Sequence, residues 1–329
     1  MIREISPNLY KIDVPLPQNP LKSLNSYIIK GPDRNLIIDT GFNREECENA
    51  LTAGLHELGI NLSRTDFFIT HLHADHSGLI GKLAGKSAAV YCSKADGLII
   101  GRGQNGPHWE EMSAFARLNG FPAGELHNVI TKHPGYKYCA VGYNNFTYVQ
   151  EKDLIEIAGY RFYCVETPGH TRGHICLYDP GKKILISGDH ILSNITPNIS
   201  LWSEKENPLK SYLRSLEKIY QLDIILTLPG HRNLIENCRE RIDELKIHHR
   251  DRLDEVMKIV EDGPKNACQV AAEMKWSLSY PSWEQFPTPQ KWFALGEAAA
   301  HLKYLVEKGE LSRQCQENTI IYSSERRVK

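Results

Sequence analysis

The stretch that decides the fold is His71-Leu72-His73-Ala74-Asp75-His76, which directly follows the apolar run DFFIT. Side chains two residues apart in an extended backbone lie on the same side, so His71 and His73 can direct two imidazoles at one point. Asp75 and His76 add a carboxylate and a third imidazole at the following turn. Neutral imidazole nitrogens and carboxylate oxygens are common ligands of divalent metal ions. The segment therefore predicts part of a metal site at the end of a strand.

Three later segments repeat this arrangement of a ligand-type residue after an apolar run. They are Pro168-Gly169-His170, Gly188-Asp189 and Pro229-Gly230-His231. Each contains a glycine, which lets the backbone bend tightly beside the polar side chain. If the four strand ends meet at one rim, they bring together seven ligand-type side chains. These are His71, His73, Asp75, His76, His170, Asp189 and His231.

Short strand-like runs and helical patterns alternate up to about residue 235. Helical spacing of apolar residues predicts helices over 45–58 and 208–220. Several strands follow one another through tight turns, such as Gly159 and Asp179-Pro180-Gly181, which favours two packed sheets flanked by helices over a doubly wound sheet. The predicted strands are 25–29, 35–39, 66–70, 88–92, 154–157, 161–167, 174–178, 184–187 and 224–228.

Residues from about 100 to 150 interrupt this alternation of strands and helices, and they predict an insertion in an N-terminal domain that spans 1–240 and carries the metal site. Long irregular segments inside a compact domain are often lids or binding loops, so the insertion is a candidate lid. Its aromatic and histidine side chains line a substrate pocket in one interpretation and only pack against each other in the other. They are His108, Trp109, His133, Tyr136 and Tyr138.

The remainder, 241–329, is predicted to be a separate C-terminal domain. Helical patterns over 250–261, 266–275 and 290–308, followed by a short strand at 319–322, are typical of a winged-helix-like module. From residue 247 onward Lys and Arg number 12 and Asp and Glu also number 12, so the tail has no net charge of the kind that phosphate binding requires. A nucleic-acid partner is therefore disfavoured, although a homodimer is compatible with the aromatic residues of the tail.

The bulk composition fits an ordinary globular enzyme. Of the 329 residues, 41% are hydrophobic and 24% charged, and the formal net charge of −1 draws the chain to neither nucleic acid nor an anionic membrane. The eight cysteines form no Cys-x-x-Cys pair, which favours free thiols. The sequence contains neither a signal-peptide pattern nor an apolar run of membrane-spanning length. The expected location is the cytoplasm.

The motif set as a whole resembles the metallo-β-lactamase-fold hydrolases, whose His-x-His-x-Asp-His signature stands here as residues 71–76. The resemblance covers about 1–235 and implies a four-layer αββα sandwich, an α+β fold. The segment 292–305 resembles the last helix of the winged-helix-like domain in hydrolases of the β-lactamase-like protein 2 type.

This resemblance implies a role for each ligand-type side chain. One metal would be held by His71, His73 and His170, and a second by Asp75, His76 and His231, with Asp189 bridging the two. Asp75 would also orient the bridging hydroxide. Two ions can lower the pKa of a shared water from about 15.7 toward about 7. Zinc suits the ligands best, while Mn²⁺ or Fe²⁺ is compatible with them.

Departures within the superfamily narrow the function. Asp189 stands where true zinc β-lactamases have cysteine, which argues against antibiotic hydrolysis, and His73 excludes the His-x-Glu pattern of flavodiiron proteins.

Asp39 and Thr70 are expected to orient ligands, and His174 and His190 are interpreted as structural neighbours of the site.

These features predict a hydrolase that cleaves a small-molecule acyl ester, thioester or lactone by a metal-bridging hydroxide. A metal-dependent ribonuclease or phosphodiesterase is the alternative, and a pure binding module ranks third.

Overall fold

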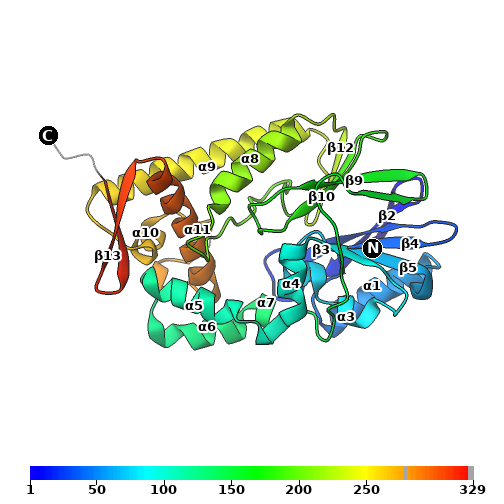
Figure 1. Cartoon of the computed structure of the whole chain (residues 1–329), viewed down its shortest axis with the longest axis horizontal. Helices are drawn as coiled ribbons and strands as arrows, with labels where there is room; N and C mark the ends of the chain where they lie inside the picture. The colour runs from blue at the N-terminus through cyan, green and yellow to red at the C-terminus, as the bar shows by residue number, and fades with distance from the viewer. Residues whose placement is uncertain (278–279, 325–329) are drawn as a thin grey trace. The chain divides into compact units, whose positions relative to one another are not determined.

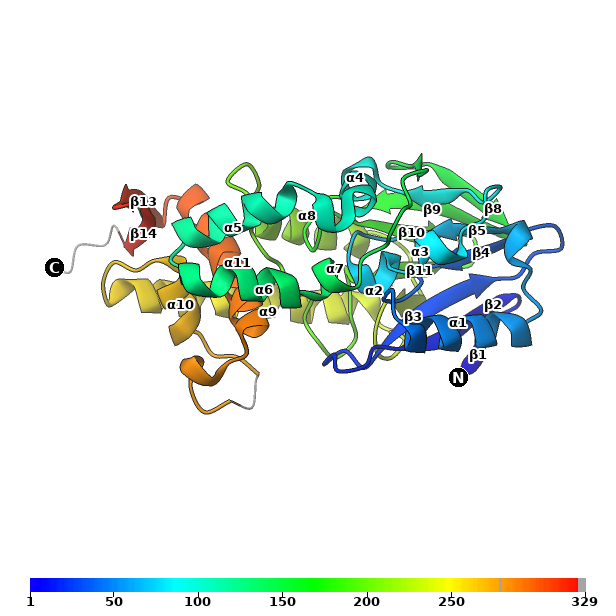
Figure 2. The ribbon, with the colours of Figure 1, turned by 90° about the horizontal axis from the view of Figure 1, so that it is seen from below.

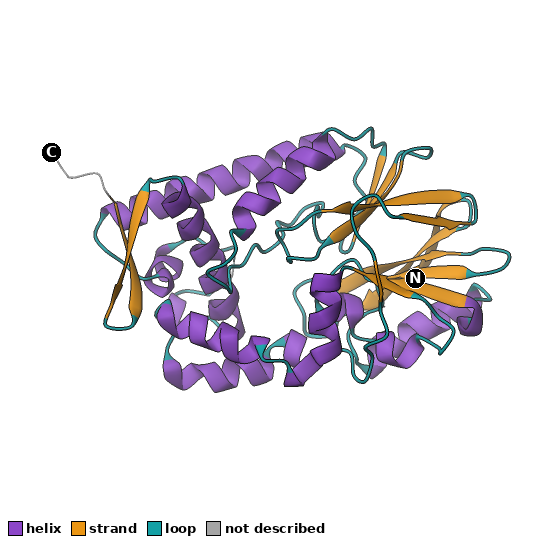
Figure 3. Cartoon of the chain, in the orientation of Figure 1, coloured by secondary structure: helices purple, strands orange, loops and turns teal. Residues whose placement is uncertain are grey.

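The computed structural model describes residues 1–277 and 280–324 (Figure 1). The chain forms two compact units, and neither is one continuous segment. The first unit consists of Met1–Gly106, Pro134–Pro197 and Ser215–Ile242. The second consists of Pro107–His133, Asn198–Arg214 and the described part of Asp243–Lys329. Strands of two sheets dominate the first unit, while the second is mainly helical (Figure 3).

Among the described residues, the larger sheet of the first unit has seven strands in sequence order. They are β1 (Ile2–Ser6), β2 (Leu9–Pro15), β3 (Ser23–Ile29), β4 (Asn35–Ile38), β5 (Thr65–Phe68), β6 (Val90–Cys92) and β7 (Thr147–Tyr148). Pairing is antiparallel from β1 to β4 and parallel from β4 to β7. The hairpin β1–β2 and strand β7 were not predicted from the sequence.

The smaller sheet has five described strands, and both sheets bury one face against the other. Its strands lie in the order β12 (Leu226–Pro229), β11 (Ile184–Gly188), β10 (Ile175–Asp179), β9 (Tyr160–Glu166) and β8 (Leu154–Ile157). One apolar cluster joins Tyr27, Ile38 and Phe68 of the larger sheet to Phe162, Leu177 and others of the smaller. Burial of this shared face drives the sheets together, and the expected sandwich of two sheets with flanking helices is confirmed.

Helices of the first unit cover the outer face of the larger sheet or connect its strands. The buried residues Cys47, Leu51 and Leu55 recur every four positions in α1, so one stripe of that helix packs on the sheet (Figure 2). The elements are α1 (Glu45–Glu57), η1 (Leu62–Arg64), α2 (Ala74–Ser77), α3 (Ile80–Leu83), α4 (Lys94–Arg102), η2 (Gly103–Asn105) and α7 (Pro134–Lys137).

The second unit has its own core around the fully buried Trp292, which stacks on Trp202 at 4.3 Å between ring centroids. Its elements are α5 (His108–Leu118), η3 (Ala123–Glu125), α6 (Leu126–Lys132), α10 (Ala267–Glu273), η4 (Trp283–Gln285), α11 (Thr288–Glu307) and the antiparallel hairpin β13 (Leu311–Gln316) and β14 (Thr319–Ser324). Helices α8 (Pro208–Tyr220) and α9 (Cys238–Glu261) each cross a unit boundary. The predicted tail helices and final strand are all present.

Within the described ranges, none of the helices combines the length and the apolar character of a membrane span.

The units depart from the continuous segments 1–240 and 241–329 that the sequence suggested. Phe115, Phe121 and Val129 of the insertion belong to the same apolar core as Val270 and Leu295 of the C-terminal helices. The insertion therefore folds with the tail. Packing between segments so distant in sequence leaves no local pattern that could have predicted it.

Candidate metal centre

All seven side chains predicted as ligands lie in the first unit at the ends of four strands. His71 and His73 follow β5, and Asp75 and His76 lie in the single turn of α2. His170 follows β9, Asp189 follows β11 and His231 follows β12. The structure brings them into three overlapping groups, each with donor atoms within 4.8 Å of one another. The groups are His71, His73 and His170; His71, His76 and Asp189; and Asp75, His76 and His231.

The first triad consists of three imidazoles whose nitrogens face one point. His73 Nδ1 lies 3.0 Å from His71 Nε2 and 2.9 Å from His170 Nε2. His71 Nδ1 lies 3.0 Å from Thr70 Oγ1, which itself donates to Asp39 Oδ2 at 2.8 Å. That hydroxyl therefore accepts from His71 Nδ1–H, leaving the Nε2 lone pair directed at the other two rings.

The second triad combines two imidazoles with a carboxylate. His231 Nε2 lies 3.3 Å from His76 Nε2 and 3.4 Å from Asp75 Oδ2. His76 Nδ1 donates to Asp39 Oδ2 at 2.7 Å, and His231 Nδ1 donates to the Ser23 carbonyl at 2.7 Å. Both Nδ1 atoms are thus occupied, so each Nε2 is the atom that can hold a proton or a metal ion.

Asp189 lies between the two triads. Its Oδ2 is 3.7 Å from His170 Nε2 and 3.5 Å from His231 Nε2, while its Oδ1 is 3.5 Å from His76 Nε2. Asp189 Oδ1 is buried and has no hydrogen-bond partner among the described residues. A buried carboxylate oxygen without a donor is costly, and a cation at this point would satisfy it. The donor set and this oxygen together fit divalent ions.

Electrostatics at the site also favour a cation. Burial opposes protonation of His231, but Asp189 and Asp75 raise its pKa to about 10. Burial likewise opposes protonation of His76, whose pKa the carboxylates of Asp189 and Asp39 raise well above its usual value. In the first triad, burial and the neighbouring imidazole of His170 lower the pKa of His73 to about 3. Neutral nitrogens on one side and a strongly negative field on the other are both suited to metal binding.

Two glycines allow the ligand segments to approach so closely. A Cβ on Gly230 would lie 2.5 Å from Asp189 Oδ1 and 2.7 Å from His76 Cε1. Gly188 has φ +48°, and a Cβ there would lie 2.7 Å from His174 Nε2. The strand ends can therefore carry ligands at these positions only with glycine beside them.

Residues that sequence reasoning did not single out hold the His231 segment in place. Asn25 Nδ2 donates to the carbonyls of Pro229 and Arg232 at 2.9 Å each, and the Tyr27 hydroxyl donates to Pro229 O at 2.8 Å. These contacts span more than 200 positions, so no local signal could have revealed them.

His174 supports Asp189 in a similar way. Its Nε2 accepts from the Asp189 backbone N–H at 3.2 Å, and its Nδ1 donates to Thr167 Oγ1 at 2.8 Å. The ring of His190 is buried, with its centroid 6.0 Å from that of His174. Both histidines therefore lie beside the seven side chains.

The aromatic residues of the insertion fall in different units. Trp109 and His133 lie in the second unit, where their rings contact each other at 5.3 Å and His133 also contacts Phe293 at 5.2 Å. Tyr138 lies in the first unit and packs on Phe42 at 5.1 Å. Each of these rings makes packing contacts, as the second interpretation expects.

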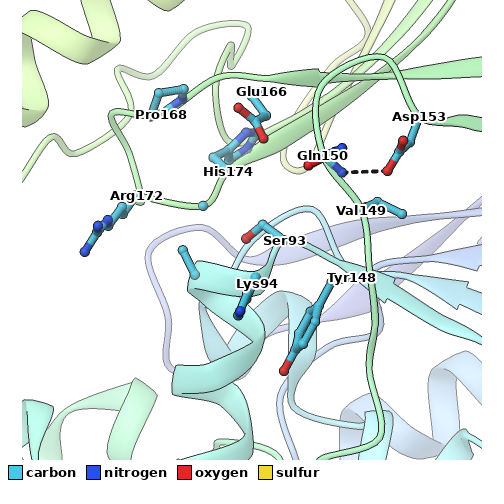
Figure 4. Close-up of a pocket in the computed structure, with 12 residues that line it drawn as sticks. Ser93, Lys94, Tyr148, Val149, Gln150, Asp153, Glu166, Pro168, Arg172 and His174 are labelled. Atoms are coloured by element: carbon cyan, nitrogen blue, oxygen red, sulfur yellow. Dashed lines mark hydrogen bonds between the residues drawn. The ribbon is translucent and has the colours of Figure 1, made fainter.

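A cavity of about 490 Å³ lies beside the segment that carries His170 (Figure 4). Its walls hold cations at Lys94 and Arg172 and carboxylates at Asp153 and Glu166. This mixed charge selects neither an anionic nor a cationic ligand.

Comparisons with known proteins agree with this geometry. Residues 20–231 match the Metallo-beta-lactamase superfamily, and residues 253–324 match the family described as Metallo-beta-lactamase-like, C-terminal domain. The chain is 24% identical over 320 residues to the probable metallo-hydrolase YqjP of Bacillus subtilis, covering 92% of this chain and 93% of that one.

Two further similarities are relevant. The acyl-coenzyme A thioesterase MBLAC2 of Gallus gallus is 27% identical over 216 residues, which cover 64% of this chain and 73% of that protein. The crystal structure of a metallo-beta-lactamase family protein from Thermus thermophilus superposes with a TM-score of 0.80 at 30% identity, covering 98% of this chain and all of that one. The predicted hydrolase class and fold are confirmed. With this fold, this ligand-type cluster and both sequence matches, the chain belongs to the metallo-beta-lactamase superfamily.

Proposed function

We propose that the protein is a dinuclear metal-dependent hydrolase of acyl esters, thioesters or lactones, with acyl thioesters foremost. The observation that carries this proposal is the position of Asp189, whose two carboxylate oxygens face both triads. The acyl-coenzyme A thioesterase among its relatives supports the thioester class. Zinc suits the nitrogen and carboxylate donors best, with manganese and iron as alternatives.

Each triad has a distinct part in this proposal. His71, His73 and His170 would hold one ion, Asp75, His76 and His231 the other, and Asp189 would bridge them. Such ions would polarise the acyl carbonyl and lower the pKa of the attacking water. Asp75 would accept a hydrogen bond from that water and so fix its direction of attack. Asp39 would keep the Nδ1 proton on His76, which leaves Nε2 available as a ligand.

Metal content and substrate choice test the proposal separately. We expect about two ions per chain by elemental analysis of metal-replete protein, and hydrolysis of acyl-coenzyme A in a panel that also contains lactones and single-stranded RNA. Asp189→Asn should lose metal and all activity. Asp179→Asn is the matched control, because this buried carboxylate accepts two backbone N–H bonds at the end of β10.

Two outcomes would contradict parts of the proposal. One ion or none in replete wild-type protein would refute the dinuclear centre. RNA cleavage that Asp189→Asn abolishes, without hydrolysis of any acyl compound, would favour the nuclease alternative.

A further inference from the structure

Asp96 is a buried carboxylate that lies outside the seven side chains of the candidate centre. It is the third residue of α4 and only 1% exposed. Its backbone N–H donates to Ser93 Oγ at 3.1 Å, which caps the helix. Helix capping does not require a carboxylate at this position, so its side chain needs another explanation.

The Asp96 carboxylate accepts hydrogen bonds from two different ligand segments. Its Oδ2 accepts from the Leu72 backbone N–H at 2.9 Å and from Thr171 Oγ1 at 2.6 Å. Its Oδ1 accepts from the Gly173 backbone N–H at 2.9 Å. Leu72 lies between His71 and His73, and Thr171 directly follows His170. One side chain therefore connects the two segments that supply the first triad.

The backbone around Gly173 is fitted to this contact. A Cβ on Gly173 would lie 2.0 Å from Ser93 Oγ and 2.6 Å from Asp96 Oδ1. Figure 4 shows Ser93, at the start of α4, facing the segment that carries Pro168, Arg172 and His174. The segment after His170 can approach α4 so closely only because residue 173 is glycine.

We propose that Asp96 is a positioning residue that sets the spacing of His170 from His71 and His73, and thereby the metal affinity of the first triad. This inference rests on the proposed metal centre. The second triad has separate supports, because His76 and His231 donate to Asp39 and to the Ser23 carbonyl. Loss of the Asp96 contacts should therefore lower the affinity of the first triad for its ion and leave the affinity of the second triad unchanged.

The first test is Asp96→Asn, read out by metal binding rather than activity. The asparagine amide keeps one acceptor oxygen. Its NH₂ group replaces the other carboxylate oxygen and cannot accept the hydrogen bonds that this oxygen accepted. Competition titration with a chelator of known affinity should show one ion bound as in wild type. Affinity for the other should fall about 10- to 100-fold, as is typical when a group that orients a ligand is removed. Asp179→Asn again serves as the control and should keep both affinities.

A milder pair of variants keeps the test decisive if Asp96→Asn does not fold. Thr171→Val removes one of the three donors, and Thr171→Ser restores a hydroxyl at the same place. We expect a selective loss of affinity for one ion in the valine variant and recovery in the serine variant. A residue that only stabilised the fold would lower the melting temperature of the metal-free protein without this selectivity.

The outcomes separate the two proposals. Fewer than two ions in the wild type would overturn the proposed centre and this role with it. Two ions in the wild type, bound with unchanged affinity in folded Asp96→Asn or in Thr171→Val, would overturn the role of Asp96 alone.

Discussion

Asp189 Oδ1 and the backbone of Gly230 illustrate how tightly the candidate centre is built. The space that a Cβ on residue 230 would need is already taken by that oxygen and by His76 Cε1. A cation would compensate this buried oxygen, which has no hydrogen-bond donor among the described residues. A change at residue 230 should therefore act on metal binding before it acts on the fold.

We predict that Gly230→Ala displaces Asp189 or His76 and lowers the metal content by at least one ion per chain. Elemental analysis after dialysis against a metal-containing buffer measures this loss. Gly85→Ala is the control, since a Cβ there meets no atom within 4 Å and should leave the metal content unchanged. A Gly230→Ala protein with full metal content would show that the segment has room to move.

At the residue scale, the sequence predicted which side chains gather at the candidate centre, and it predicted the contacts of Asp39 and Thr70 with His71 and His76. His71, Asp189 and His231 were expected at one site because each follows an apolar run, and the ends of these strands do meet at one edge of the two sheets. Asp96 could not be predicted, since the Ser93–Asp96 spacing indicates only a helix start. Its bonds to Leu72 and Thr171 depend on how distant segments pack.

At the element scale, α9 and α11 are joined by a buried pair of histidines. His249 Nδ1 lies 3.2 Å from His301 Nε2, and His301 Nδ1 donates to the Glu297 carbonyl at 2.8 Å. Both rings are almost fully buried, with Tyr212 and the Arg252–Glu297 ion pair nearby. Burial lowers the pKa of both imidazoles, which favours their neutral forms.

This pair should make the protein less stable in acid. Burial lowers the pKa of His301 to about 4, below the usual value near 6.5, so the unfolded chain binds the proton more tightly. The stabilisation is complete above pH 6.5 and is lost as the pH falls toward 4. Between pH 7.5 and 5 the loss for this residue alone is about 2 kcal/mol.

Urea unfolding at pH 7.5 and pH 5, with a chelator present in both buffers, measures the effect. His301→Leu should reduce the pH dependence, whereas the exposed His127→Gln should keep it at the wild-type value. An identical pH dependence in His301→Leu and wild type would show that the pair is not the source.

The elements themselves were predictable to different degrees. Helix 45–58 and the strand before His71 follow from local periodicity, and α1 and β5 lie where expected. Strands β1 and β2 were missed because charged residues interrupt their apolar runs, Arg3 and Glu4 in β1 and Lys11 and Asp13 in β2. Strand β7 has only two residues, too few for any periodic signal.

At the scale of the whole molecule, the candidate centre depends on the first unit alone. We predict that metal removal raises amide hydrogen exchange in the four ligand segments, at 69–77, 168–175, 188–191 and 229–232. Exchange in the hairpin β13–β14, which packs in the other core, should not change. Hydrogen-exchange mass spectrometry of the metal-replete and chelated protein measures both. Equal increases in the hairpin would mean that the ions stabilise the entire chain.

Because the second unit is built from three separate segments, it cannot complete its core until the last of them has been synthesised. Phe115, Phe121 and Val129 are synthesised long before Val270 and Leu295, which complete their core. At ~5–20 residues per second, synthesis from residue 134 to the end of α11 takes on the order of ten to thirty seconds. During that interval the helices of the insertion expose apolar surface on the nascent chain. Translation speed and chaperone supply should therefore influence the yield of folded protein more strongly than if the two units were consecutive.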